Sequence, residues 1–178
     1  MTLEDRLKRI KLVLMDVDGV LTDGTIWFLP SSGGAMDETK GFHSQDGIAM
    51  QWLHMQGIWT GMISGRKSSA TEMRAKTGHC KYVYLGDHEK IAAMEEIVKD
   101  SGLAREEIAF LGDDLTDVVC FRRAGISIAV ANAMAEVKAT ADYVTKTPGG
   151  QGALREFTEM LLKAQGKWDA ILKKYEIT

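Results

Sequence analysis

The sequence predicts an α/β protein in which a doubly wound, Rossmann-like parallel sheet carries helices on both faces. One observation supports this fold class, and a second bears on the number of domains. Short apolar runs rich in β-branched residues alternate with segments of helical spacing, which is the pattern of βαβ units. The chain has 178 residues, 45% of them hydrophobic, which suits one well-packed domain over residues 1–178. Five runs are predicted strands: Leu12–Met15, Trp59–Ile63, Tyr82–Leu85, Ile108–Leu111 and Ile126–Val130.

The first predicted strand ends in a cluster of acidic residues. The stretch "LVLMDVDGVLTDG" places Asp16, Asp18 and Asp23 directly behind the apolar run. Residues 25–42 then break the alternation with an apolar run, a Pro-Ser-Ser-Gly-Gly turn and a second short arm, which predicts a β-hairpin flap. Because this flap follows the aspartates, it can overhang them.

Polar residues also follow the later strands. Ser64-Gly65-Arg66 comes after the second strand and Gly112-Asp113-Asp114 after the fourth. Proteins with parallel sheets bind ligands beyond the carboxyl ends of their strands, so these groups are expected to converge. Helical spacing predicts a helix around Ile91, Met94 and Val98, and a C-terminal helix and tail over residues 152–178.

The acidic cluster predicts a Mg²⁺ site. Side chains two apart in an extended segment point the same way, so Asp16 and Asp18 can face one pocket while Val17 packs into the core and Gly19 lets the chain turn. With Asp113 from another strand they form an oxygen-rich site for Mg²⁺, at expected Mg–O distances of about 2.0–2.1 Å. The cation would offset the repulsion and bridge to a phosphate oxygen, leaving one carboxylate as a nucleophile and its neighbour to carry a proton.

Composition limits the kinds of binding partner and the cellular location that the sequence predicts. The formal net charge is −3 with no long basic run, which argues against nucleic-acid binding and favours a small phosphate compound. Cys80 and Cys120 are isolated, which is typical of a reducing compartment and predicts a cytoplasmic protein. The N-terminal segment is charged throughout, so neither a signal peptide nor a membrane span is expected.

Four motifs occur in order at the strand ends: "DVDGVLTDG", "ISGR", a lysine that opens a helix, and "GDDLTD". This set resembles the haloacid dehalogenase superfamily of aspartate-nucleophile phosphatases. The resemblance implies that Asp16 attacks phosphorus and becomes an aspartyl-phosphate, and that Asp18 protonates the leaving alcohol and then activates water. It further implies that Ser64 holds a phosphate oxygen and that Lys90 neutralises the nucleophile and the phosphate.

The same resemblance implies the metal ligands. Asp113 matches the Mg²⁺ ligand of the fourth motif, Asp16 and the main-chain carbonyl of Asp18 complete the set, and Asp117 supports it through water. Asp114 can instead cap the helix that begins there.

Within the superfamily the chain resembles a capless subfamily, the 3-deoxy-D-manno-octulosonate 8-phosphate phosphatases, because only the flap and one helix–strand unit stand where larger relatives carry a cap. The segments "DGVLTDG", "GFHSQDGIAM", "SGR" and "GGQGALREFTEMLLKAQGKW" carry this likeness. It implies a homotetramer in which a neighbour's hairpin and C-terminal segment help to close the site. The candidate substrate-binding residues are Gly65, Arg66, Asp23 and Gln45.

Two residues differ from the pattern of this subfamily at positions that concern substrate binding. Relatives that prefer octulosonate usually have arginine where Gln45 stands and often a basic residue where Gln151 stands, so the grip on the sugar-acid carboxylate is expected to be weaker. Arg66 favours the octulosonate branch over the nonulosonate phosphatases, in which a Glu-Lys pair is more usual.

Other functions remain as alternatives: a phosphatase for a nonulosonate or another sugar phosphate, and a weakly active oligomerisation module that accompanies sugar activation. A receiver domain is disfavoured because it has adjacent acids after its first strand and is shorter. The apolar run Ile26–Leu29 on the flap predicts self-association that covers it, and the alternative is that these residues pack on their own domain.

Overall fold

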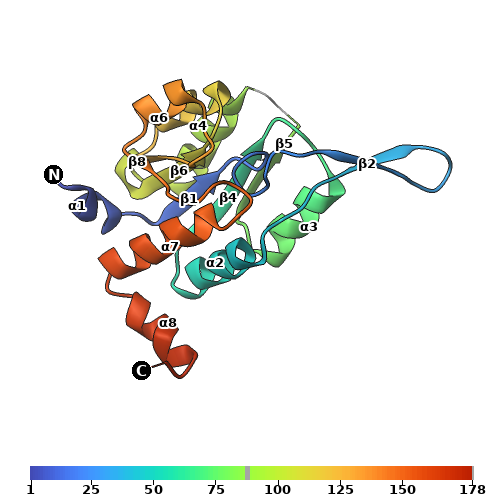
Figure 1. Ribbon diagram of the computed structural model, residues 1–178. Coiled ribbons are helices and arrows are strands. Elements are labelled where there is room, and N and C mark those ends of the chain that lie inside the picture. The colour runs from blue at the N-terminus through green and yellow to red at the C-terminus, as the bar shows by residue number, and fades with distance from the viewer. Residues whose placement is uncertain (87–88, 178) are drawn as a thin grey trace.

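The computed structural model describes residues 1–86 and 89–177, and it confirms the predicted α/β fold (Figure 1). All five predicted strands are present. A sixth, of two residues, was not predicted because so short a run carries no periodic pattern. The six strands pair in parallel in the order β5–β4–β1–β6–β7–β8. They are β1 (Leu12–Met15), β4 (Trp59–Ser64), β5 (Tyr82–Leu85), β6 (Ile108–Gly112), β7 (Ile126–Ala129) and β8 (Tyr143–Val144).

Helices cover both faces of this sheet. In Figure 1, α2 (Ser44–Met55), α3 (Ser69–Thr77) and α7 (Ala153–Ala164) lie on one face, and α4 (Lys90–Ser101) and α6 (Ala135–Thr140) on the other. Helix α5 (Val118–Phe121) packs against α4 and α6. The remaining elements are α1 (Leu3–Leu7), α8 (Trp168–Lys174) and the 3₁₀ helices η1 (Arg105–Glu107) and η2 (Leu115–Asp117). Within the described part of the chain, no helix has both the length and the apolar character that crossing a bilayer requires.

The centre of the sheet is the core. Every residue of β1 is fully buried, because β1 is covered on both faces, and this explains its continuous apolar run. Burying each such side chain stabilises the fold by about 1.5–3 kcal/mol. Met15 pairs with Met62 of β4 and with Leu111 of β6. This register brings the residues that follow all three strands to the same edge of the sheet.

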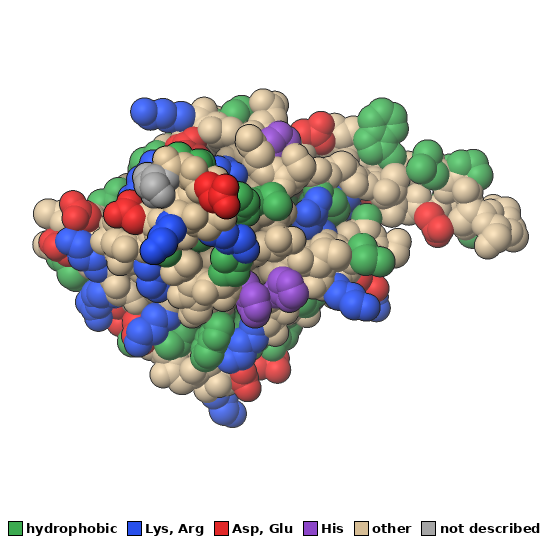
Figure 2. Space-filling model, turned by 90° about the horizontal axis from the view of Figure 1, so that it is seen from below, with side chains coloured by type: hydrophobic (Ala, Val, Ile, Leu, Met, Phe, Trp, Pro, Cys, Tyr) green, Lys and Arg blue, Asp and Glu red, His purple; other side chains and the backbone are tan. Residues whose placement is uncertain are grey.

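The flap is the predicted hairpin. Strands β2 (Trp27–Pro30) and β3 (Met36–Thr39) pair antiparallel, with Phe28 opposite Glu38, and project from the body of the domain (Figure 1). Ile26 at its base is half-buried, whereas Trp27, Phe28 and Leu29 are 60%, 59% and 52% exposed. Figure 2 shows hydrophobic side chains along this arm. In the single chain, therefore, these side chains do not pack into the domain.

Candidate active site

Asp16 and Asp18 line one cavity at the carboxyl end of β1. Val17, between them, is fully buried, as the alternation of side chains predicts. Gly19 then turns the chain with φ +84°, in the left-handed region that favours glycine. A Cβ atom at this position would overlap the Asp113 carboxylate. The glycine therefore allows the first loop to approach the loop after β6.

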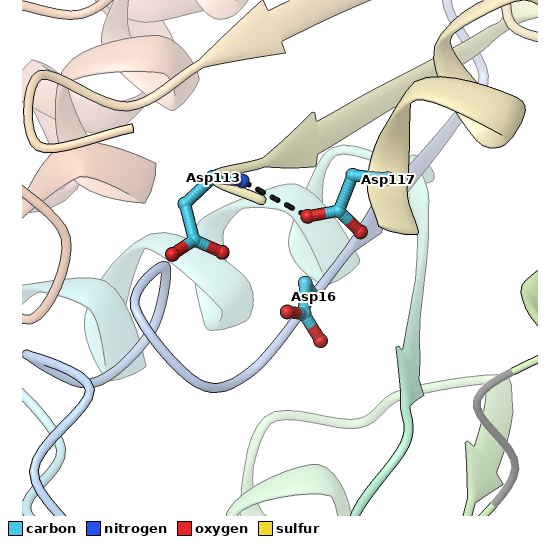
Figure 3. A group of neighbouring side chains, drawn as sticks. All are labelled: Asp16, Asp113 and Asp117. Atoms are coloured by element: carbon cyan, nitrogen blue, oxygen red, sulfur yellow. Dashed lines mark hydrogen bonds between the residues drawn. The ribbon is translucent and has the colours of Figure 1, made fainter. Parts of the chain in front are cut away.

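Three carboxylates meet at this edge of the sheet. Asp113 follows β6 and Asp117 ends η2, and both face Asp16 (Figure 3). One oxygen from each lies within 4.8 Å of the others. Asp117 Oδ2 accepts hydrogen bonds from the main-chain N–H groups of Asp113 (2.9 Å) and Asp114 (3.2 Å), so Asp117 shapes the loop that presents Asp113. Asp114 is exposed and caps η2, its carboxylate accepting a hydrogen bond from Leu115 N–H.

Lys90 is the cation that faces these carboxylates. It is the first residue of α4, and its side chain is 3% exposed. Its Nζ lies 3.0 Å from Asp16 Oδ1 and 2.7 Å from Asp117 Oδ1. A lysine in a first helical turn is usually solvated, so its burial between two carboxylates marks it as part of the site.

The charges in this cluster do not cancel. Burial, followed by the charge of Asp117, raises the pKa of Asp16 to about 7. Burial, followed by Asp16 and Asp117, raises the pKa of Asp113 to about 7. Burial disfavours the charged form of Lys90, but Asp16 and Asp117 outweigh it and raise the lysine pKa. Since one lysine faces three carboxylates, full ionisation leaves uncompensated negative charge that a bound cation would offset.

The Asp18 carboxylate is held on both of its oxygens. Lys40, directly after β3, donates from Nζ to Asp18 Oδ1 at 2.7 Å. Ser64 Oγ donates weakly to Asp18 Oδ2 at 3.5 Å and accepts from Arg66 N–H at 3.2 Å. Lys40 was not predicted from the sequence. Its only signal was a cation within the flap, and no local pattern showed that it points inward.

Two glycines of the loop before α7 brace the aspartate loop. Gly150 N–H donates to the Val20 carbonyl (3.0 Å), and a Cβ at Gly149 would overlap the main chain of Gly19. Asn132, which sequence reasoning also missed, links the same segments: its Nδ2 donates to the Gly19 carbonyl (3.0 Å) and its Oδ1 accepts from Gly149 N–H (2.6 Å). The glycine-rich segment therefore supports the position of the loop that carries Asp16 and Asp18.

The cavity itself is small. Its volume is about 180 Å³, below the roughly 300–1,000 Å³ of typical small-molecule sites. It can therefore hold the phosphate end of a substrate while a sugar extends beyond it. The structure brings most of the predicted site residues together here, and the lining also includes Thr116, which was not predicted. The lining residues are Asp16, Asp18, Ser64, Gly65, Arg66, Lys90, Asp113, Asp114 and Thr116.

Two predicted substrate-binding residues lie outside this cavity. Asp23 lines a separate cavity with Trp27, and its carboxylate accepts from Thr25 N–H at 2.8 Å. Gln45 lines a groove along α7 together with Gln151. Within one chain, therefore, Asp23 and Gln45 are not placed beside the phosphate end of a substrate.

Known proteins share this architecture. Residues 66–156 match the family of haloacid dehalogenase-like hydrolases. The chain is 39% identical over 165 residues to the 3-deoxy-D-manno-octulosonate 8-phosphate phosphatase of Haemophilus influenzae, covering 93% of this chain and 89% of the relative. It is 37% identical to that of Escherichia coli K12, covering 92% and 85%.

Several solved structures are similar over nearly the whole chain. A probable YrbI-family phosphatase of Pseudomonas syringae matches with a TM-score of 0.90 and 40% identity, covering 97% of this chain and 96% of that one. The 3-deoxy-D-manno-octulosonate 8-phosphate phosphatase of Moraxella catarrhalis, in complex with magnesium, phosphate and the octulosonate sugar acid (KDO), matches with a TM-score of 0.89 and 39% identity, covering 97% of both chains.

Proposed function

The chain belongs to the haloacid dehalogenase-like hydrolases, and on that basis we propose that it is a Mg²⁺-dependent phosphatase acting on 3-deoxy-D-manno-octulosonate 8-phosphate. The observation that carries this proposal is the cavity in which buried Asp16 pairs with Lys90 while Asp18 and Asp113 face the same space. Relatives that carry out this reaction align over more than nine-tenths of the chain.

The residues present fit a magnesium ion. Asp113 Oδ1 is buried and has no hydrogen-bond partner, and it belongs to a group of three carboxylates with closely spaced oxygens. We assign Asp16, Asp113 and the main-chain carbonyl of Asp18 as the residues that would hold Mg²⁺. Asp117, whose oxygens already accept from Lys90 and two main-chain N–H groups, supports them. When bound, Mg²⁺ offsets the negative charge of the carboxylates and of the phosphate dianion.

The chemistry then follows from two neighbouring carboxylates. An Asp16 oxygen attacks phosphorus, the bond between phosphorus and the sugar oxygen breaks, and that oxygen takes a proton from Asp18. A water molecule next attacks the aspartyl-phosphate, Asp18 takes its proton, and the bond to Asp16 breaks to release phosphate. Lys90 compensates the charge of Asp16 and the phosphate, and Ser64 donates a hydrogen bond to a phosphate oxygen.

The substrate side of the proposal involves self-association. The small cavity leaves the sugar outside, and the flap beside it exposes three large apolar side chains, Trp27, Phe28 and Leu29. We infer a homotetramer in which a neighbouring subunit covers this flap and completes the site, so that Gly65, Arg66, Asp23 and Gln45 contact the sugar acid across the assembled surface. A cytoplasmic location is part of the same proposal, because isolated cysteines are typical of a reducing compartment.

The experiment is a panel of sugar phosphates assayed for phosphate release with Mg²⁺ and with EDTA. The octulosonate 8-phosphate should have the highest kcat/KM, EDTA should abolish turnover, and Asp16→Asn should lower it by several orders of magnitude. Preference for a nonulosonate phosphate would correct the substrate alone, in line with the Gln45 departure. Absence of turnover of every phosphate ester would instead indicate the weakly active oligomerisation module.

A further inference from the structure

Lys40 is buried without lining the cavity. Its side chain is 0% exposed, although it directly follows β3, a hairpin strand in which every residue is exposed or half-buried. Burying an ammonium group costs several kcal/mol unless good partners are present. Lys40 has one hydrogen-bonded partner, Asp18 Oδ1 at 2.7 Å, and a second carboxylate oxygen, Glu38 Oε1, lies within ion-pair distance at 3.1 Å. The residues that line the Asp16 cavity do not include it. Any effect of Lys40 on the reaction must therefore pass through a neighbour.

The contact with Lys40 places the two oxygens of Asp18 in different environments. Oδ1 accepts from Lys40 at 2.7 Å. Among the residues that the structure describes, only Ser64 Oγ hydrogen-bonds to Oδ2, at 3.5 Å, and Ser64 lines the cavity. A protonated Asp18 would therefore carry its proton on Oδ2, on the side of Ser64, which lines the cavity.

We propose that Lys40 is a positioning residue that orients the Asp18 carboxylate for proton transfer to the leaving alcohol. This inference rests on the proposed phosphatase function. When the bond between phosphorus and the alkyl oxygen breaks, the proton moves from Asp18 Oδ2 to that oxygen, and Asp18 becomes a carboxylate. The ammonium on Oδ1 stabilises the negative charge that appears, and it prevents the carboxyl group from rotating away from the cavity.

Glu38 holds this lysine in place. Its Oε2 also lies 3.3 Å from Arg66 Nη1, so the ion pairs run from Arg66 through Glu38 and Lys40 to Asp18. Arg66 and Asp18 both line the cavity. The residue that follows the second hairpin strand thus contacts the catalytic aspartate, although the hairpin itself projects from the domain.

The test uses two leaving groups of similar size. The p-nitrophenolate ion leaves phosphate without needing a proton, whereas the benzyl alcohol of benzyl phosphate must be protonated as it leaves. The parameter is kcat/KM with Mg²⁺, because it reports only the steps up to departure of the alcohol. Lys40→Met should lower kcat/KM for benzyl phosphate by about 10–100-fold, short of the 10²–10⁴-fold of a lost general acid, and by less than about threefold for p-nitrophenyl phosphate.

A matched control and a double variant separate positioning from general damage. Lys67→Met, which removes an exposed lysine from the neighbouring loop, should leave both values within about twofold. Lys40→Arg, which keeps a charged donor, should recover part of the loss on benzyl phosphate. In an Asp18→Asn background, Lys40→Met should cause no further loss, because the residue through which it acts is already disabled.

Each outcome is decisive. Equal losses for the two esters, no loss at all, or a full additional loss in the Asp18→Asn background would overturn the role of Lys40. If Lys40→Met does not fold, Lys40→Gln, which keeps a donor without charge, makes the same comparison. Wild-type protein inactive on both esters and on the sugar phosphates would instead refute the proposed function.

Discussion

Raising the pH should destabilise the metal-free protein, because two carboxyl groups of the site have raised pKa values. Burial is the first cause for both, and the pKa of Asp16 and that of Asp113 rise from 3.8 to about 7. At pH values between 3.8 and about 7, the folded protein binds more protons than the unfolded chain. The contribution of these two carboxyl groups to stability is therefore fully present below about pH 4 and is lost as the pH rises through 7.

The size of the effect follows from these values. A change of one in pKa corresponds to about 1.4 kcal/mol, so the ionisation of Asp16 costs the folded state roughly 4 kcal/mol. Asp113 is partly exposed and solvent screens it, so we take about half of that for it. For a chain of 178 residues, 1 kcal/mol shifts Tm by about 2–4 °C. The Tm of the metal-free protein should thus fall by roughly 10 °C or more between pH 5 and pH 8.

The assay is thermal unfolding followed by circular dichroism at pH 5, 6, 7 and 8, in EDTA and in millimolar Mg²⁺. Mg²⁺ should raise Tm most at pH 8, since it binds the ionised carboxylates. Asp16→Asn has nearly the same shape but does not titrate, so at pH 8 in EDTA it should melt above wild type. Asp37→Asn, on the exposed hairpin arm, is the matched control and should follow wild type. A metal-free Tm that is flat or rises from pH 5 to pH 8 would refute the reasoning.

Three further predictions concern other parts of the site. Lys90→Met leaves buried carboxylates without their cation, so urea titration at pH 8 should show a loss of about 3–5 kcal/mol in unfolding free energy. The loss should be smaller at pH 5, and equal losses at the two pH values would contradict this prediction. Charged replacements at Trp27 and Phe28 should dissociate the proposed homotetramer in light scattering and lower sugar-phosphate turnover; a wild-type monomer with full activity would contradict this proposal. Gly149→Ala puts a Cβ against the Gly19 main chain and should displace the loop that carries Asp16, so turnover should fall by about tenfold or more. Unchanged kinetics would show that this contact does not position the loop.

Much of the fold could be predicted because buried parallel strands leave a strong signal. Leu12–Met15 and Tyr82–Leu85 have the predicted bounds, since each is a short apolar run with a polar or glycine boundary. Strand β8 was missed because two residues contain no period to detect. The hairpin was predicted from its Pro-Ser-Ser-Gly-Gly turn, but sequence alone did not show whether its apolar residues pack on the domain or project from it.

The site was predictable to the extent that it follows strand ends. Strand register carries Asp16, Ser64 and Asp113 to one edge, so a pattern of polar residues after apolar runs was enough to group them. Spacing alone does not distinguish Lys90 from an ordinary solvated lysine in a first helical turn, and its pairing with Asp117, 27 residues further on, is visible only in the fold. Lys40 was missed altogether because contacts between a hairpin and a distant loop leave no periodic trace.

The hairpin connects the surface of the protein to its proposed acid–base residue. The hairpin exposes Trp27 and Phe28, and Glu38, which lies opposite Phe28, pairs with Lys40, whose ammonium group holds Asp18. An isolated two-stranded hairpin is only marginally stable in water, so the position of its base depends on what holds the arm. A subunit that covers the apolar arm would therefore also fix Lys40 against Asp18. In this arrangement self-association would supply the residues of a neighbouring subunit that contact the sugar. It would also keep the proton donor aligned with the leaving oxygen.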